Sequence, residues 1–125
     1  MPHFYNATIR NAGLNAIVTE AGSGALIKLY NGTRPAAGGA VSSQTLIAEL
    51  AAGATLGTVA GGVLTMNAIT SDSSANNTGT PTWARVFKSD GTTLVADFDL
   101  TGFPACSATY AVGITSWTIT AGNAT

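Results

Sequence analysis

Charged side chains are scarce in this sequence. Asp, Glu, Lys and Arg make up only 9% of its 125 residues, whereas ordinary soluble domains carry about 25%. The formal net charge is -1, and a net charge near zero favours association between molecules. Thr, Ser, Asn, Gly and Ala must therefore form most of the surface, and this composition favours a protein that packs against neighbours.

Basic residues and long apolar runs are also missing. Five Lys and Arg residues leave no basic stripe for phosphates, so we predict no nucleic-acid partner. No apolar run approaches the ~20 residues of a membrane-spanning helix, so we predict no membrane partner. The stretch MPHFYNATIRNAG lacks the charged and apolar regions of a signal peptide, and we therefore expect synthesis in a cytoplasm.

Residues that commonly carry catalysis are few. His3 is the only histidine and Cys106 the only cysteine, so no intrachain disulfide can form. A Cys106–His3 pair would supply a nucleophile and a base, but these distant positions would have to meet with hydrogen-bond geometry. The ordinary alternatives are a small buried thiol and a solvent or interface imidazole. We expect no catalytic residues and do not expect an enzyme.

Two acidic stretches could bind metal. Asp97 and Asp99 alternate along a predicted strand, so both carboxylates face one side, as a metal or acid–base pair needs. The alternative is a solvated face, or one paired with Lys88 or Arg85 across a hairpin. The stretch SDSSANN, residues 71–77, offers oxygen ligands but only one carboxylate, which is little charge for calcium. We therefore expect a polar loop there, no metal site and no cofactor.

Residues 6–20, NATIRNAGLNAIVTE, predict the only helix. Asn6 can cap it, and Gly22 or Gly24 can end it. Four apolar residues fall near one face of a 3.6-residue period: Ile9, Leu14, Ile17 and Val18.

The remaining sequence predicts β structure within a single domain, residues 1–125. The domain has an N-terminal arm at 1–5, strands within 25–120 and a tail at 121–125. Turn signals separate six or seven strands at regular spacing, which favours an antiparallel β-sandwich or barrel. The expected strands lie near residues 25–30, 45–50, 63–70, 82–89, 92–100 and 107–120, with loops at 33–42 and 71–81.

The stretch VFKSDGTTLVADF, residues 86–98, predicts a β-hairpin around a Ser-Asp-Gly turn. In its second arm, alternation puts four apolar residues on one face: Leu94, Ala96, Phe98 and Leu100. Val95, Asp97 and Asp99 point the other way. Trp83 and Trp117 lie within predicted strands, where core packing is one interpretation and interface or sugar stacking the other.

His3, Phe4 and Tyr5 precede the predicted helix. The two aromatic side chains can form a hydrophobic staple onto that helix. They can equally dock into a neighbouring subunit. The sequence leaves both alternatives open.

Two long stretches resemble a group of small structural proteins of tailed bacteriophages. They are IKLYNGTRPAAGG, residues 27–39, and GVLTMNAITSDSSANNTGTPTWARVFKSDGTTLVADFDL, residues 62–100. With NATIRNAGLNAI before them and SWTITAGNA after them, the resemblance covers nearly the whole chain. The likeness is greatest to the capsid cement, or decoration, proteins of short-tailed phages. The stretch LTGFPACSATY, residues 100–110, departs from the more polar turn of that family, so Phe103 and Pro104 either form a local contact surface or fill a core gap.

The resemblance implies a β-sandwich of jelly-roll type that binds outside an assembled shell of major capsid protein. It implies a virion location after synthesis in the bacterial host, and no catalytic residues. We expect a homo-oligomer, most simply a dimer, and a protein interface that includes His3, Phe4, Tyr5, Arg85, Asp97, Asp99 and Phe103. The alternatives are a tail, neck or head-fibre component, or a glycan- or receptor-binding module with an exposed tryptophan platform.

Overall fold

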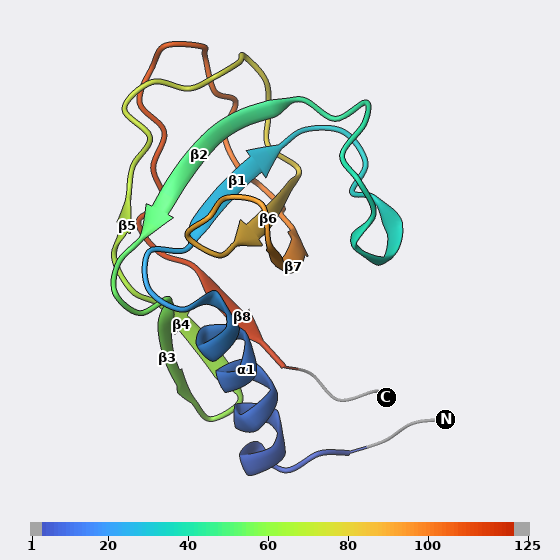
Figure 1. Ribbon diagram of the computed structural model, residues 1–125, viewed down its shortest axis with the longest axis vertical. Coiled ribbons are helices and arrows are strands. Elements are labelled where there is room, and N and C mark those ends of the chain that lie inside the picture. Colours follow the sequence, from blue (N-terminus) through green and yellow to red (C-terminus); the bar gives the residue numbers. More distant parts are fainter. Residues whose placement is uncertain (1–3, 122–125) are drawn as a thin grey trace.

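The chain forms two antiparallel sheets and one N-terminal helix, which confirms the mainly β prediction. The computed structural model describes residues 4–121 (Figure 1). The larger sheet has five strands in the order β5-β2-β1-β6-β7, and the smaller sheet has three in the order β3-β4-β8. The N-terminal helix α1 lies against β3 and β4 of the smaller sheet.

Helix α1 spans Ala7–Ala21, close to the predicted 6–20. The Asn6 side chain accepts the Ile9 N–H at 3.0 Å, and Gly22 ends the helix at a φ of 66°. Leu14 and Ala21 are buried in the core. Ile9 does not share their face and is 54% exposed, because only the helix from Leu14 onward reaches the core.

The five-stranded sheet holds most of the apolar core. Its strands are β1 (Leu26–Tyr30), β2 (Leu46–Ala52), β5 (Ile69–Thr70), β6 (Trp83–Phe87) and β7 (Leu94–Asp99). Its inner face consists of alternating apolar side chains with no exposed surface or almost none, among them Ile27, Leu29, Leu50, Ala84 and Val86. Every neighbouring pair of strands is antiparallel, as predicted.

The smaller sheet corrects the predicted strand at 63–70. That stretch is divided between β4 (Val63–Met66) in one sheet and β5 in the other, and an unpredicted strand, β3 (Gly57–Ala60), pairs with β4. Gly61 and Gly62, both at positive φ, make the tight turn of this hairpin. The chain changes sheets after Asn67, whose backbone N–H and side-chain amide are bonded to the Leu56 and Thr55 carbonyls.

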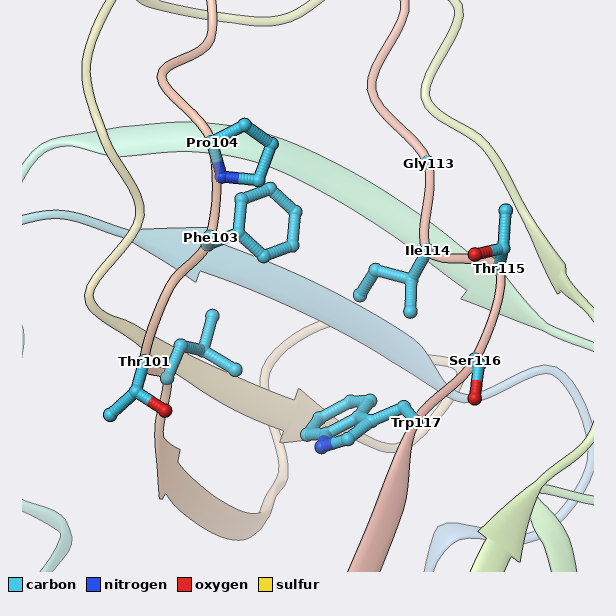
Figure 2. A pocket seen from close by; sticks show the side chains of 9 residues that line it. Thr101, Phe103, Pro104, Gly113, Ile114, Thr115, Ser116 and Trp117 are labelled. Atoms are coloured by element: carbon cyan, nitrogen blue, oxygen red, sulfur yellow. The ribbon is translucent and has the colours of Figure 1, made fainter.

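The predicted strand at 107–120 is mostly irregular. Only β8 (Thr118–Thr120) is a ladder strand, and two isolated bridges, Asp72–Val112 and Gly79–Cys106, tie the preceding residues to the 71–81 loop. A turn that places Thr109 at a φ of 71° interrupts the run. The segments around Phe103 and Ile114 therefore cross in front of the larger sheet as extended but unladdered chain (Figure 2).

The β6–β7 hairpin forms as predicted, but a bulge changes its alternation. The register shifts beside Phe87, which pairs with Leu94. Leu94 consequently lies next to Gly38, while Val95 packs against the core. The prediction that Leu94 shares the apolar face of Phe98 is therefore wrong, because a bulge inserts one extra residue and reverses the alternation beyond it.

Asp90 holds the hairpin turn together. Its Oδ1 accepts the backbone N–H groups of Thr92 and Thr93, each at 2.8 Å, and its other oxygen accepts the Thr93 hydroxyl. The Thr93 hydroxyl, followed by the two backbone N–H groups, lowers the pKa of Asp90 to about 2. Gly91 completes the turn at a φ of 74°.

We expect the stabilising effect of Asp90 to disappear in acid. Its pKa is lower in the folded chain than the ~3.9 of an unfolded Asp, so its contribution is present above about pH 4 and is lost as the pH falls towards 2. Asp90→Ala should therefore unfold at lower denaturant concentration than the parent at pH 7, and the two midpoints should converge near pH 2. A difference that stays constant across this range would contradict the assignment.

Candidate interaction surfaces

Four charged residues form a row across the outer face of the larger sheet. The register places Glu49, Lys28, Arg85 and Asp97 side by side on β2, β1, β6 and β7. Lys28 Nζ lies 3.5 Å from Glu49, and Arg85 donates two hydrogen bonds to Asp97, at 2.6 and 2.8 Å. The row is therefore two neighbouring ion pairs, and it carries no net charge.

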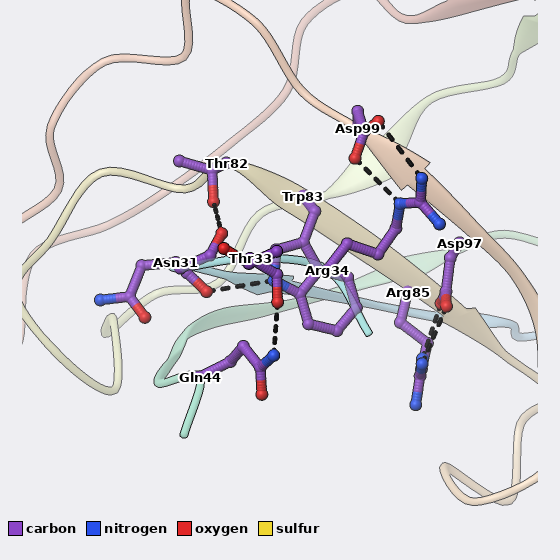
Figure 3. A network of polar contacts seen from close by, with 10 residues as sticks. Asn31, Thr33, Arg34, Gln44, Thr82, Trp83, Arg85, Asp97 and Asp99 are labelled. Atoms are coloured by element: carbon purple, nitrogen blue, oxygen red, sulfur yellow. Dashed lines mark hydrogen bonds and ion pairs between the residues drawn. The ribbon is translucent and has the colours of Figure 1, made fainter. Parts of the chain in front are cut away.

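Residues 33–44, which we call the covering loop, lie over one end of this row. Figure 3 shows Arg34 of this loop bonded to Asp99, and Arg85 bonded to Asp97. Arg85 donates a further hydrogen bond to the Gly39 carbonyl at 2.9 Å, and Arg34 donates to Asp99 at 2.9 Å. The side chains of Arg85 and Asp97 are only 6% and 7% exposed as a result. The ions are removed from water, but their hydrogen-bonding capacity is used within the chain.

The base of the covering loop is fixed by amide side chains. Asn31 Oδ1 accepts the Thr45 N–H at 2.8 Å, and the Gln44 side-chain amide donates to the Thr33 carbonyl. The Thr82 hydroxyl donates to the Gly32 carbonyl at 2.6 Å. Both ends of the loop are thus joined to β1, β2 and the start of β6, which holds the loop against the sheet.

Trp83 lies beneath this network and offers no platform for a sugar. Its ring stacks on Tyr30 with centroids 4.5 Å apart, and its indole N–H donates to the Asn31 carbonyl at 3.1 Å. Only 1% of Trp83 is exposed. Of the two tryptophans on which a glycan-binding module would depend, this one is buried on the outer face of the sheet.

Within residues 4–121, which contain all five basic and six acidic residues of the chain, every charged side chain has a partner. Lys88 and Glu20 form a further ion pair at 2.6 Å, and Arg10 donates to the Tyr5 carbonyl at 3.2 Å. Asp72 accepts the backbone N–H groups of Glu49 and Ser74. Each of these charged side chains is therefore held by an ion pair or a hydrogen bond within the chain.

The two stretches considered for metal binding serve other purposes. The Asp72 carboxylate joins its loop to β2, and Asp97 and Asp99 each bind an arginine. In the described part of the chain, no three His, Cys, Asp or Glu residues are grouped so that they could hold a metal ion.

An apolar groove lies on the opposite side of the sheet from the ion pairs. It is a hollow of about 370 Å³ between the segments 100–104 and 113–117, and its main apolar side chains are Leu100, Phe103, Pro104, Ile114 and Trp117 (Figure 2). Trp117 packs edge-on against Phe98, with ring centroids 5.7 Å apart. A second hollow of about 330 Å³ shares Phe103, Pro104 and Gly113 with it. Neither hollow is lined by a charged residue.

Cys106 lines the second hollow as a buried thiol. Its Sγ lies 3.6 Å from the Pro104 carbonyl, and burial raises its pKa, so it stays protonated at neutral pH. Asp97 and Asp99 bind arginines near the covering loop and do not meet this thiol. His3, the other member of the formal catalytic pair, lies outside the described residues.

The N-terminal arm presents aromatic side chains to solvent. Phe4 is 77% exposed and Tyr5 is 44% exposed, so Phe4 forms no staple onto the helix. The position that a staple would pair with Tyr5 is Arg10, which is not apolar and instead donates to the Tyr5 carbonyl. Docking of the arm into a neighbouring subunit, the other alternative, stays a prediction.

The structure thus separates the predicted interface residues into three places. Arg85, Asp97 and Asp99 belong to the network at the covering loop, Phe103 lines the apolar groove, and Phe4 and Tyr5 lie on the arm. His3 is not among the described residues. The sequence predicted a loop at 33–42, but not that it would cover the Arg85–Asp97 pair, and it did not single out Arg34 or Ile114.

Comparison with models of protein families, with curated proteins and with solved structures found no match for this chain. Among the described residues, no helix is long and apolar enough to cross a membrane.

Two isosteric substitutions distinguish the buried ion pair from the exposed one. We expect Asp97→Asn to lower the free energy of unfolding by roughly 3 kcal/mol, because it leaves the buried Arg85 charge unbalanced. Asp99→Asn should have little effect, because Asp99 is 67% exposed and water replaces its contact with Arg34. Urea unfolding of both variants measures the difference. Equal losses would show that the covering loop does not bury the Arg85–Asp97 pair.

Proposed function

We propose that this chain is a structural virion protein, the capsid cement or decoration protein of a tailed bacteriophage. In this proposal it has a β-sandwich of jelly-roll type and binds the outside of the assembled shell, where it bridges neighbouring major capsid protein subunits. The proposal begins from the resemblance of residues 27–39 and 62–100 to that family. The observation that carries it is the internal pairing of every charged side chain in residues 4–121.

Internal pairing favours docking onto another protein. A free charge at a contact must lose its water, and that loss can exceed the attraction it gains. In this chain the neutral groove and the aromatic arm can be covered without removing water from an unpaired ion. Apolar contact area, rather than charge complementarity, then supplies the binding free energy.

Stabilisation of a shell follows from binding to the assembled state alone. Each occupied site lowers the free energy of that state by RT ln(1 + [L]/Kd), whereas free subunits gain nothing. A protein that contacts two capsomers at once also gains effective concentration from its second contact. A homo-oligomer, most simply a two-fold dimer, presents the same surface to both neighbours.

The test uses purified protein and shells of its phage that lack it. We expect the protein to sediment with these shells and to raise the temperature at which they release DNA. Binding should be equally tight at about 0.1 M and 1 M salt, although the Debye length falls from ~10 Å to ~3 Å. Shells that neither bind the protein nor gain heat resistance would contradict the proposal, and binding lost at high salt would contradict its apolar basis.

A further inference from the structure

The walls of the apolar groove carry unused peptide groups. Between the Leu100 N–H, which donates to Thr82, and the Gly79–Cys106 bridge, no backbone N–H in the described chain forms a hydrogen bond. The same holds on the other wall for residues 113–116, between the Asp72–Val112 bridge and Trp117. Both walls lie outside any ladder, with bends at Gly102 and Thr115, and both border an apolar surface. This combination recognises an extended apolar peptide, which pairs through its backbone and inserts its side chains.

The N-terminal arm of the same chain is an uncharged segment that carries an exposed apolar side chain. Residues 4–6 precede the helix without helical or strand structure, and Phe4 is the most exposed large apolar residue of the described chain. Residues 3–9, HFYNATI, contain no Asp, Glu, Lys or Arg. The arm and the groove therefore match in polarity, and neither would bring an unpaired charge into the contact.

Phe4 cannot reach the groove of its own copy. The first turns of α1 lie beside Gly62, whose N–H donates to Asn11, whereas the groove meets the same hairpin at Met66, whose N–H donates to Trp117. These ends are separated by about 13 Å of strand. Two extended residues beyond Asn6 span only about 7 Å. Figure 1 shows the arm leaving the helix at the end remote from the larger sheet.

We propose that the arm of one copy occupies the apolar groove of a second copy. In this contact the Phe4 side chain lies against Phe103, Ile114 and Trp117, and the arm backbone pairs with the groove walls. Reciprocal exchange of two arms closes a two-fold dimer. The inference rests on the self-association included in the proposed function, but it does not require the capsid.

A photo-cross-link tests the contact directly. Phe4 is replaced by the photoreactive analogue benzoylphenylalanine in the full-length chain, which is mixed with an isotopically heavy parent chain. We expect irradiation to join light chains to heavy chains, with position 4 attached to peptides that contain Phe103, Ile114 or Trp117. Cross-links confined to single chains, or attached to any other surface, would overturn the proposal.

Sedimentation of single variants gives an independent test. Phe4→Ser should weaken dimerisation roughly tenfold or more, because it removes the apolar side chain that fills the groove. Ile9→Ser is the matched control, since Ile9 is 54% exposed but lies on the helix, and it should leave the dimer unchanged. Weakening by Ile9→Ser alone would place the contact on the helix and overturn the proposal.

The groove side is tested by Ile114→Ser, with near-ultraviolet circular dichroism as the check on folding. A folded Ile114→Ser variant should lose the same affinity as Phe4→Ser, and combining the two substitutions should cost little more than either alone. Additive losses would overturn the proposal. A parent chain that stays monomeric at all concentrations would overturn it too, yet if that monomer still binds shells the proposed function stands.

Discussion

The buried ion pair between Arg85 and Asp97 is the interaction on which the outer face of the larger sheet depends. A charge removed from water without a partner costs several kcal/mol, so the covering loop can lie over β6 and β7 only while both ions are present. The Gly39 carbonyl accepts a further hydrogen bond from the Arg85 guanidinium, beside those that the Asp97 carboxylate accepts. The pair therefore joins β6, β7 and the covering loop at one point.

The charged side chains elsewhere in the molecule are also bound to partners within the chain. Lys28, Arg34 and Lys88 each bind a carboxylate, and Asp72 and Asp90 hold loops through backbone N–H groups. On the other side of the larger sheet, the segments 100–104 and 113–117 enclose a neutral groove. On one side of the larger sheet, the covering loop buries part of the charged row. The other side carries apolar side chains and, among the described residues, backbone N–H groups that form no hydrogen bond. We infer that the second side is the one that meets neighbours.

The elements that depend on nearby residues were predictable from the sequence. Asn6 and Gly22 mark the two ends of the helix and lie next to it in the sequence. Asp90 likewise lies in the turn of the hairpin that it predicts. Features that depend on distant contacts were not. The bulge beside Phe87 had no signal in the sequence, and Arg34 binds Asp99, which lies 65 residues away along the chain.

The candidate surfaces show the same division. The sequence marked Phe4 and Tyr5 as unusual because they precede the helix, and Phe103 because the family that the chain resembles has a more polar turn there. It also grouped Asp97 with Arg85, since alternation and hairpin pairing are local rules. It gave no sign that residues 107–117 would fail to form a ladder, because apolar alternation there satisfies the strand pattern equally well. The bridge from Asp72 to Val112 and the hydrogen bond from the Ala75 N–H to the Tyr110 carbonyl tie that segment to the 71–81 loop instead.

A cryo-EM map of the virion tests the central claim most directly, because it locates the chain and counts its copies. The account predicts density in many copies over the junctions between capsomers. The covering loop should face solvent, and the side that carries the apolar groove should face protein. Density in a few copies along the tail or portal axis would contradict the cement function and favour a tail or neck component instead.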